Sequence, residues 1–241
     1  MPGIAVTLAW RWAFAGGAVL ALAFAFLVPA GTSGNVVHRK EEAREKDAPI
    51  VPLVLLALGI GLGSTATATL GAFIVESSVA AGLRIDTAGF LLALGSAVNI
   101  VVRVGFGYLA DGMSGGRLRL VAAMLGIGIV GFALLATGER GLILPGALLA
   151  FGAGWGWPGL FNFAVVKTNP GTPAAATGVT QTGASGGAAL GSLVFGLVVE
   201  ATSYDVAWLV SGAIALAALA AMLVGRRMLL RDRRGVELFG R

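Results

Sequence analysis

Apolar stretches alternate with short polar segments along almost the whole chain. Seven of these stretches approach the roughly 20 residues that a helix needs to cross a bilayer. Backbone groups in lipid must bond within their own segment, so each stretch is expected to be a helix rather than a strand. The pattern therefore predicts an all-α, polytopic membrane protein with seven transmembrane helices, at 7–28, 51–77, 87–110, 118–137, 142–166, 174–200 and 206–224.

One polar segment is much longer than the others and divides the chain. Residues 30–50 form a charged linker between a first transmembrane segment at 1–29 and the remaining six at 51–241. A signal peptide is the alternative interpretation of residues 1–29, because Arg11 precedes the apolar stretch and small residues follow it. The length of the stretch and the basic residues that closely follow it favour a membrane anchor.

The positions of lysine and arginine predict the orientation, since these residues are enriched in cytoplasmic loops. If the linker is cytoplasmic, only Arg11, Arg84 and Arg140 lie outside, and Arg103 lies within a helix. The amino terminus is then outside, the carboxyl terminus inside, and the expected location is a plasma or inner membrane. The basic residues on the inner side are Arg39, Lys40, Arg44, Lys46, Arg117, Arg119, Lys167, Arg226, Arg227, Arg231, Arg233, Arg234 and Arg241.

Composition agrees with a membrane protein and excludes several other classes. Charged residues make up 12% of the chain, against about 25% in soluble domains. There is no cysteine and His38 is the one histidine, so we expect no metal, no cofactor and no enzyme. The sequence has no phosphate-binding Gly-x-x-x-x-Gly-Lys-Ser/Thr loop, so a nucleotide-driven pump is disfavoured. The sequence pI near 10.4 could indicate nucleic acid, but the basic residues flank the apolar segments, so the expected partner is the lipid bilayer.

The predicted helix at 174–200 has two different faces. Gly183, Gly187 and Gly191 recur every fourth residue, and such a stripe of small residues lets another helix backbone approach closely. Thr177, Gln181 and Ser185 form a second stripe on nearly the opposite side of the helix. The polar stripe indicates a water-filled cavity.

Arg103 is the most informative single residue, because it lies about 10 Å from the inner end of its helix at 1.5 Å per residue. An unpaired arginine at the centre of a membrane costs about 2.5–3.5 kcal/mol on insertion scales, so it generally has a compensating role. Asn99 lies one turn away on the same face. Binding of an anionic substrate and a structural role near the inner interface remain equally open for Arg103.

Residues 154–159 read Gly-Trp-Gly-Trp-Pro-Gly and are expected to break the helix at 142–166 in its middle. Broken helices commonly line the cavities of transporters, which makes Trp155 and the nearby Asn162 candidate substrate-binding residues. A kink packed against neighbouring helices, with the tryptophans in lipid, is the alternative. Glu76 is expected to be an ordinary interfacial residue, with proton coupling as a weaker possibility.

Four segments carry motifs that occur together in one family. Residues 107–119 read Gly-Tyr-Leu-Ala-Asp-Gly-Met-Ser-Gly-Gly-Arg-Leu-Arg, residues 10–14 read Trp-Arg-Trp-Ala-Phe, the charged linker follows, and residues 202–208 read Thr-Ser-Tyr-Asp-Val-Ala-Trp. In order, spacing and predicted orientation they resemble the major facilitator superfamily of secondary transporters. The resemblance covers family helices six to twelve.

This resemblance implies half of a major facilitator fold plus one extra helix. Gly107, Asp111 and Arg117 would form the cytoplasmic gating motif, with Asp111 also placed to cap the following helix. The motif departs from the family pattern, because Gly112 stands where arginine is usual and the turn is longer, so Arg117 or Arg119 must supply the positive charge. Arg103 stands where monocarboxylate- and oxalate-type members carry their anion-binding arginine.

The leading hypothesis is a secondary active transporter of a small solute, for which an organic anion is one candidate, acting by alternating access. Its expected substrate-binding residues are Arg103, Asn99, Gln181, Asn162 and Trp155. Because the family transports through a cavity between two halves, a separate amino-terminal half or a second copy is the expected partner. A seven-helix receptor or sensor and a non-functional fragment are the alternatives.

Overall fold

The computed structural model describes residues 15–23, 26, 50–113 and 115–239, and the chain divides into two units, residues 1–43 and 44–241. In the first unit, residues 15–23 are helical, within the first predicted transmembrane segment. The rest of that segment and almost all of the predicted linker lie outside the described residues.

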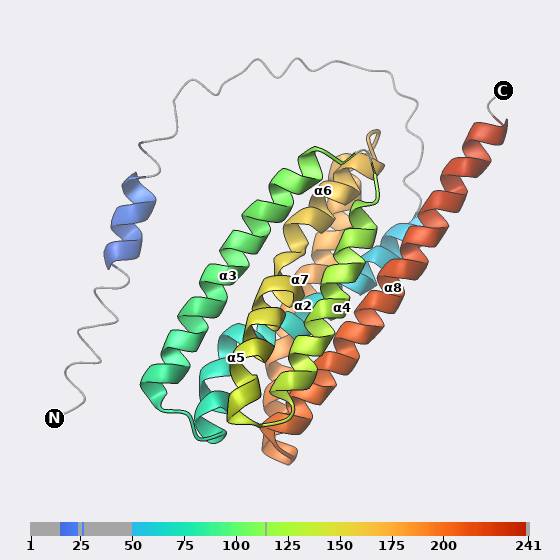
Figure 1. Cartoon of the computed structure of the whole chain (residues 1–241). Coiled ribbons are helices and arrows are strands. Elements are labelled where there is room, and N and C mark those ends of the chain that lie inside the picture. The colour runs from blue at the N-terminus through green and yellow to red at the C-terminus, as the bar shows by residue number, and fades with distance from the viewer. Residues whose placement is uncertain (1–14, 24–25, 27–49, 114, 240–241) are drawn as a thin grey trace. The chain divides into compact units, whose positions relative to one another are not determined.

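The second unit is a bundle of long helices (Figure 1), and its described residues contain no strand. Five of its helices are long and apolar enough to cross a membrane, with α8 qualifying over Tyr204–Leu229. The multi-pass, all-α prediction is confirmed to this extent. The elements are α2 (Ile50–Ala80), α3 (Ile85–Asp111), α4 (Arg117–Leu135), α5 (Arg140–Leu149), the π-helix η1 (Ala150–Gly154), α6 (Pro158–Thr168), α7 (Pro173–Ala201) and α8 (Tyr204–Phe239).

Helix α8 ends 15 residues later than the sequence predicts, at Phe239 instead of Val224. The prediction followed hydropathy, which falls when arginines begin at Arg226. Arginine, leucine and methionine all favour helix in water as well as in lipid. The helix therefore continues past the apolar segment into the basic tail.

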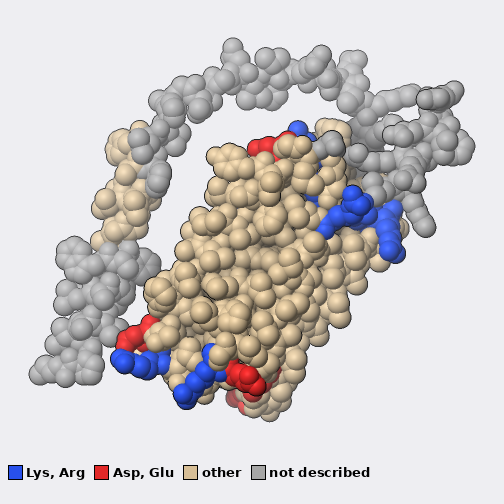
Figure 2. All heavy atoms as spheres, viewed as in Figure 1, with Lys and Arg blue, Asp and Glu red and all other residues tan. Residues whose placement is uncertain are grey.

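Charged side chains gather at the two ends of the bundle, and the face shown in Figure 2 has an uncharged band between them. Arg117 and Lys167 lie at one end, which we call the basic end. Arg84, Arg140 and Asp205 lie at the opposite end, which we call the distal end. This distribution is typical of a bundle whose middle is embedded in lipid.

Helices α2 and α7 pack through the predicted glycine stripe. A β-carbon added at Gly183, Gly187 or Gly191 would overlap the α2 backbone at Ala57, Gly61 or Thr65, respectively. The hydroxyl of Thr65 donates to the Gly187 carbonyl at 3.1 Å. The predicted close approach is confirmed, and its partner is α2.

The packing follows an approximate two-fold pattern that relates α2, α3 and α4 to the three helical segments that follow them. The broken segment α5–η1–α6 is the counterpart of α2, α7 of α3, and α8 of α4. Helix α2 packs on α7 and α8, and its counterpart packs on α3 and α4. Helices α2 and α3 also touch, as do α6 and α7, while α4 packs on α8. The match is incomplete, because α7 and α8 pack more closely than α3 and α4 do.

Helices α3 and α7 are the least covered of the long apolar helices. In each of these two helices only 17% of an 18-residue apolar stretch is buried, compared with 50% in α2 and α4. Large apolar side chains stand out on α3, among them Tyr108 at 78% exposure and Val101 at 70%. These two helices occupy counterpart positions, so the bundle leaves two related surfaces open.

Candidate functional site

The helix predicted at 142–166 is broken in its middle, as the sequence indicates. Helix α5 runs into the π-helix η1, and α6 begins at Pro158. Proline has no N–H, so the carbonyl of Gly154 one turn earlier receives no backbone bond from it. The Trp157 indole N–H donates to that carbonyl at 2.6 Å. Trp157 is fully buried, so this tryptophan does not lie in lipid.

Two polar side chains of α3 bond to the same broken segment. The side-chain amide of Asn99 donates to the Phe151 carbonyl at 2.7 Å, and Arg103 Nη2 donates to the Trp155 carbonyl at 3.1 Å. The two donor residues are four positions apart in the sequence, and so are the two acceptor residues. The bonds therefore link successive turns of the two helical segments. Both side chains therefore have a structural role: they satisfy carbonyls where the backbone ladder is irregular.

Arg103 keeps most of its donors available. Its guanidinium carries five N–H groups, and the bond to Trp155 is the one hydrogen bond it makes with the described residues. The residue is exposed and borders a cavity of about 300 Å³. The cavity, which we call the arginine cavity, is lined by Arg103, Phe106, Gly107, Ala110, Asp111, Gly156, Gly159, Leu160 and Phe163.

The structure brings together some of the predicted site residues and leaves others apart. Arg103, Gly107 and Asp111 line one cavity. Trp155 does not line it, but its backbone carbonyl accepts the hydrogen bond from Arg103. Asn162 is half-buried, and its Oδ1 has no hydrogen-bond partner in the described part of the chain. Gln181 is exposed on α7, which packs on α2, α6 and α8 rather than on α3. Gln181 and Arg103, both of which the structure describes, form no hydrogen bond with each other.

The turn after α3 is held by Arg117. Its guanidinium donates to the carbonyls of Ala110 and Met113, and its cation lies 4.9 Å from the centre of the Phe163 ring. A cation at the carboxyl end of a helix is favoured by the helix dipole. Lys167 approaches the same ring at 5.6 Å. Phe163 was not predicted as a functional residue, although its spacing of four from Lys167 was a readable signal.

The predicted capping role of Asp111 is wrong. Asp111 is the last residue of α3, and α4 begins after Gly116, whose φ of 80° is left-handed and which provides no side-chain cap. Asp111 is exposed, and it forms no ion pair with Arg117 in the described part of the chain. The extended turn separates the acid from the start of α4, so Arg117, not Asp111, caps a helix here.

Fold and site together define the class of molecule: a multi-pass α-helical membrane protein with a buried break in one crossing and an arginine beside it. Comparison of the sequence with protein-family models and with curated proteins gives no match. The resemblance to the major facilitator superfamily consequently rests on the motifs of this chain.

Proposed function

We propose that this chain is the carboxyl-terminal portion of a secondary transporter of the major facilitator type, which moves a small solute by alternating access. The observation that carries the proposal is the pair of bonds from Asn99 and Arg103 to the broken segment α5–η1–α6, beside a cavity. Transporters commonly bind solutes at discontinuous helices near the middle of the membrane. Intramembrane ionisable residues mark such pathways.

The two-fold packing pattern supports this fold. Each repeat has three crossings, and three is an odd number, so the second repeat enters the membrane in the direction opposite to the first. Inverted three-plus-three repeats are nested in each half of major facilitator proteins. The six crossings of residues 51–241 would then form one half, and residues 1–29 one helix of the other half.

The chemistry of the arginine cavity favours an anionic solute. Arg103 offers a planar fork of donors that matches a carboxylate in two-point contact, and one of its nitrogens is already held by Trp155. The carboxylate of Asp111 lines the same cavity nearer the basic end. A solute with a single carboxylate and an apolar body would match Arg103 and the ring of Phe163.

Helices α3 and α7 indicate where a second half would bind. Both carry polar residues on exposed surfaces, Arg103 on one and Gln181 on the other, and such groups are costly in contact with lipid. A covering half would place both helices at a central, wet interface. We therefore expect the chain alone not to transport.

The test is a flux assay in vesicles. Purified chain reconstituted alone should give no saturable uptake of small carboxylates, while the chain together with an amino-terminal half should restore it. Mass measurement in detergent should show a complex in the second case. Saturable uptake by a monomer of this chain would refute the need for a second half, and a complete pair that moves no solute would refute the transporter proposal.

The proposed orientation places the basic end in the cytoplasm of a plasma or inner membrane. The chain has no cysteine, so single cysteines can report it directly. Gly115→Cys at the basic end and Gly141→Cys at the distal end both replace exposed glycines with open space around them. In intact cells, an impermeant thiol reagent should label residue 141 and leave residue 115 unlabelled until the membrane is opened. The reverse pattern would contradict the orientation.

A further inference from the structure

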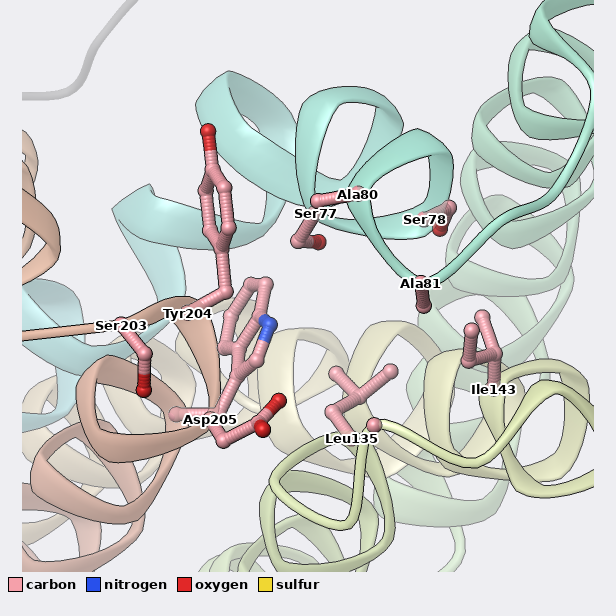
Figure 3. Close-up of a pocket in the computed structure, with 11 residues that line it drawn as sticks. Ser77, Ser78, Ala80, Ala81, Leu135, Ile143, Ser203, Tyr204 and Asp205 are labelled. Carbon is pink, nitrogen blue, oxygen red and sulfur yellow. The ribbon is translucent and has the colours of Figure 1, made fainter.

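A second cavity opens at the distal end of the bundle, where α2 and α4 end and α5 and α8 begin. It has a volume of about 310 Å³, and we call it the distal cavity. Figure 3 shows its labelled residues, with Ser77 and Ser78 contributed by α2, and Tyr204 and Asp205 by the start of α8. Its lining residues are Ser77, Ser78, Ala80, Ala81, Leu135, Gly138, Ile143, Ser203, Tyr204, Asp205 and Trp208.

Ser78, which lines this cavity, has a buried hydroxyl without a hydrogen-bond partner among the described residues. The buried hydroxyls of Thr67, Thr180 and Ser77 each bond to a carbonyl three or four residues earlier. The hydroxyl of Ser78 makes no hydrogen bond with any described residue, although Ser78 is only 1% exposed. Burying a hydroxyl without a partner is unfavourable, and a ligand in the cavity would supply one.

The charge of the lining is negative. Asp205 is the one charged residue among the lining residues, it is exposed, and it forms no ion pair within the described part of the chain. Its carboxylate lies directly over Gly138, where an added β-carbon would meet Oδ1 at 2.9 Å. Arg140, which follows closely, donates instead to the carbonyl of Ala81 at 3.0 Å. The cavity therefore presents a carboxylate that has no ion-pair partner among the described residues.

The remaining walls are apolar and rigid. Trp208 is 1% exposed and fixed by ring contacts with Phe195 at 4.6 Å and Phe132 at 6.1 Å between centroids. Leu135 and Ile143 complete this side of the cavity. The volume lies at the lower end of the range for small-molecule sites and is far larger than a bare metal ion requires.

We propose that the distal cavity binds a small organic ammonium ion. The N–H groups of the ion donate to Asp205 and Ser78, and its apolar part packs against Trp208, Leu135 and Ile143. Carboxylates accept strong charge-assisted hydrogen bonds from ammonium groups, and apolar walls suit the apolar part of a small ligand. The site lies at the opposite end of the bundle from the arginine cavity and takes a ligand of opposite charge. It does not depend on the transporter proposal.

The test uses the full chain in detergent and measures binding of 2-phenylethylammonium, with the neutral 2-phenylethanol and sodium chloride as comparison ligands. The ammonium ion should bind saturably and about tenfold or more tightly than the alcohol, because a hydrogen bond to a charged group has a contribution of that order. Asp205→Asn should weaken its binding by about the same factor. The matched control, Glu200→Gln, removes an exposed carboxylate at the same end that does not line the cavity, and it should leave binding unchanged.

Ser78→Ala separates ligand binding from folding. Removing an unpartnered hydroxyl deletes no hydrogen bond of the protein, so the melting temperature without ligand should stay the same or rise, while ammonium binding weakens. The proposal is overturned by the absence of saturable ammonium binding, or by binding that neither Asp205→Asn nor Ser78→Ala changes. Sodium binding that requires Asp205 while the ammonium ion does not bind would overturn the organic ligand class.

Discussion

Replacing Gly187 with leucine is expected to disrupt the packed helix bundle. A β-carbon at residue 187 would overlap the α2 backbone at Gly61, and backbone cannot rotate away as a side chain can. The helices would have to separate along the stripe, which also breaks the bond from Thr65 to the Gly187 carbonyl. We expect a loss of about 3 kcal/mol or more in unfolding free energy, measured by titrating the detergent-solubilised protein with a denaturing detergent.

Gly186→Leu is the matched control, because it makes the same chemical change at the preceding residue of α7. Gly186 is exposed, and an added β-carbon there meets nothing within 4 Å. This variant should unfold at nearly the same denaturant concentration as the unmodified protein. Equal destabilisation by both variants would show that leucine in α7, rather than the contact with α2, is responsible.

Replacing Arg103 with lysine is expected to reduce uptake of an anionic solute about ten- to a hundredfold, in vesicles that contain both halves. Lysine keeps the charge and can still reach the Trp155 carbonyl, but it lacks the planar fork. The loss of one charge-assisted hydrogen bond, at about 1.5–3 kcal/mol, sets this range. The measurement is initial uptake at low solute concentration, together with the melting temperature of each variant.

A control at the distal end distinguishes substrate binding from general effects of replacing arginine. Arg84 is highly exposed and pairs with Asp86 at 3.2 Å, so Arg84→Lys should transport normally. If Arg103→Lys transported as well as the unmodified protein, the role of Arg103 would be confined to holding the broken crossing. A large fall in melting temperature with Arg103→Lys would indicate the same structural role.

Local signals in the sequence predicted much of the fold. The spacing of Gly183, Gly187 and Gly191 was sufficient to predict a close helix contact, and Pro158 with its neighbouring glycines was sufficient to predict the break. Each of these features is determined by residues within a single helix, so it can be predicted from that helix alone. The register between segments could not be predicted, so the partners of Arg103 and Asn99 emerged only from the structure.

The missed features share a physical cause. Asp111 was expected to cap α4 because the sequence does not show where the longer turn lets the next helix begin. The distal cavity is formed by the ends of four crossings, and Ser78 and Asp205 look like ordinary terminal residues when each is considered alone. A site composed of short polar side chains from several helix ends has no spacing that a single sequence reveals.

The bonds from α3 to the broken crossing also bear on the order in which the chain enters the membrane. An unpaired carbonyl in hydrocarbon costs several kcal/mol, so a segment with irregular backbone is poorly suited to enter lipid unaccompanied. Asn99 and Arg103 precede Phe151 and Trp155 by 52 residues, and synthesis proceeds from the amino terminus. The donors on α3 are therefore synthesised before the acceptors, and we expect α3 to be available to bond the irregular helix as that helix enters the membrane.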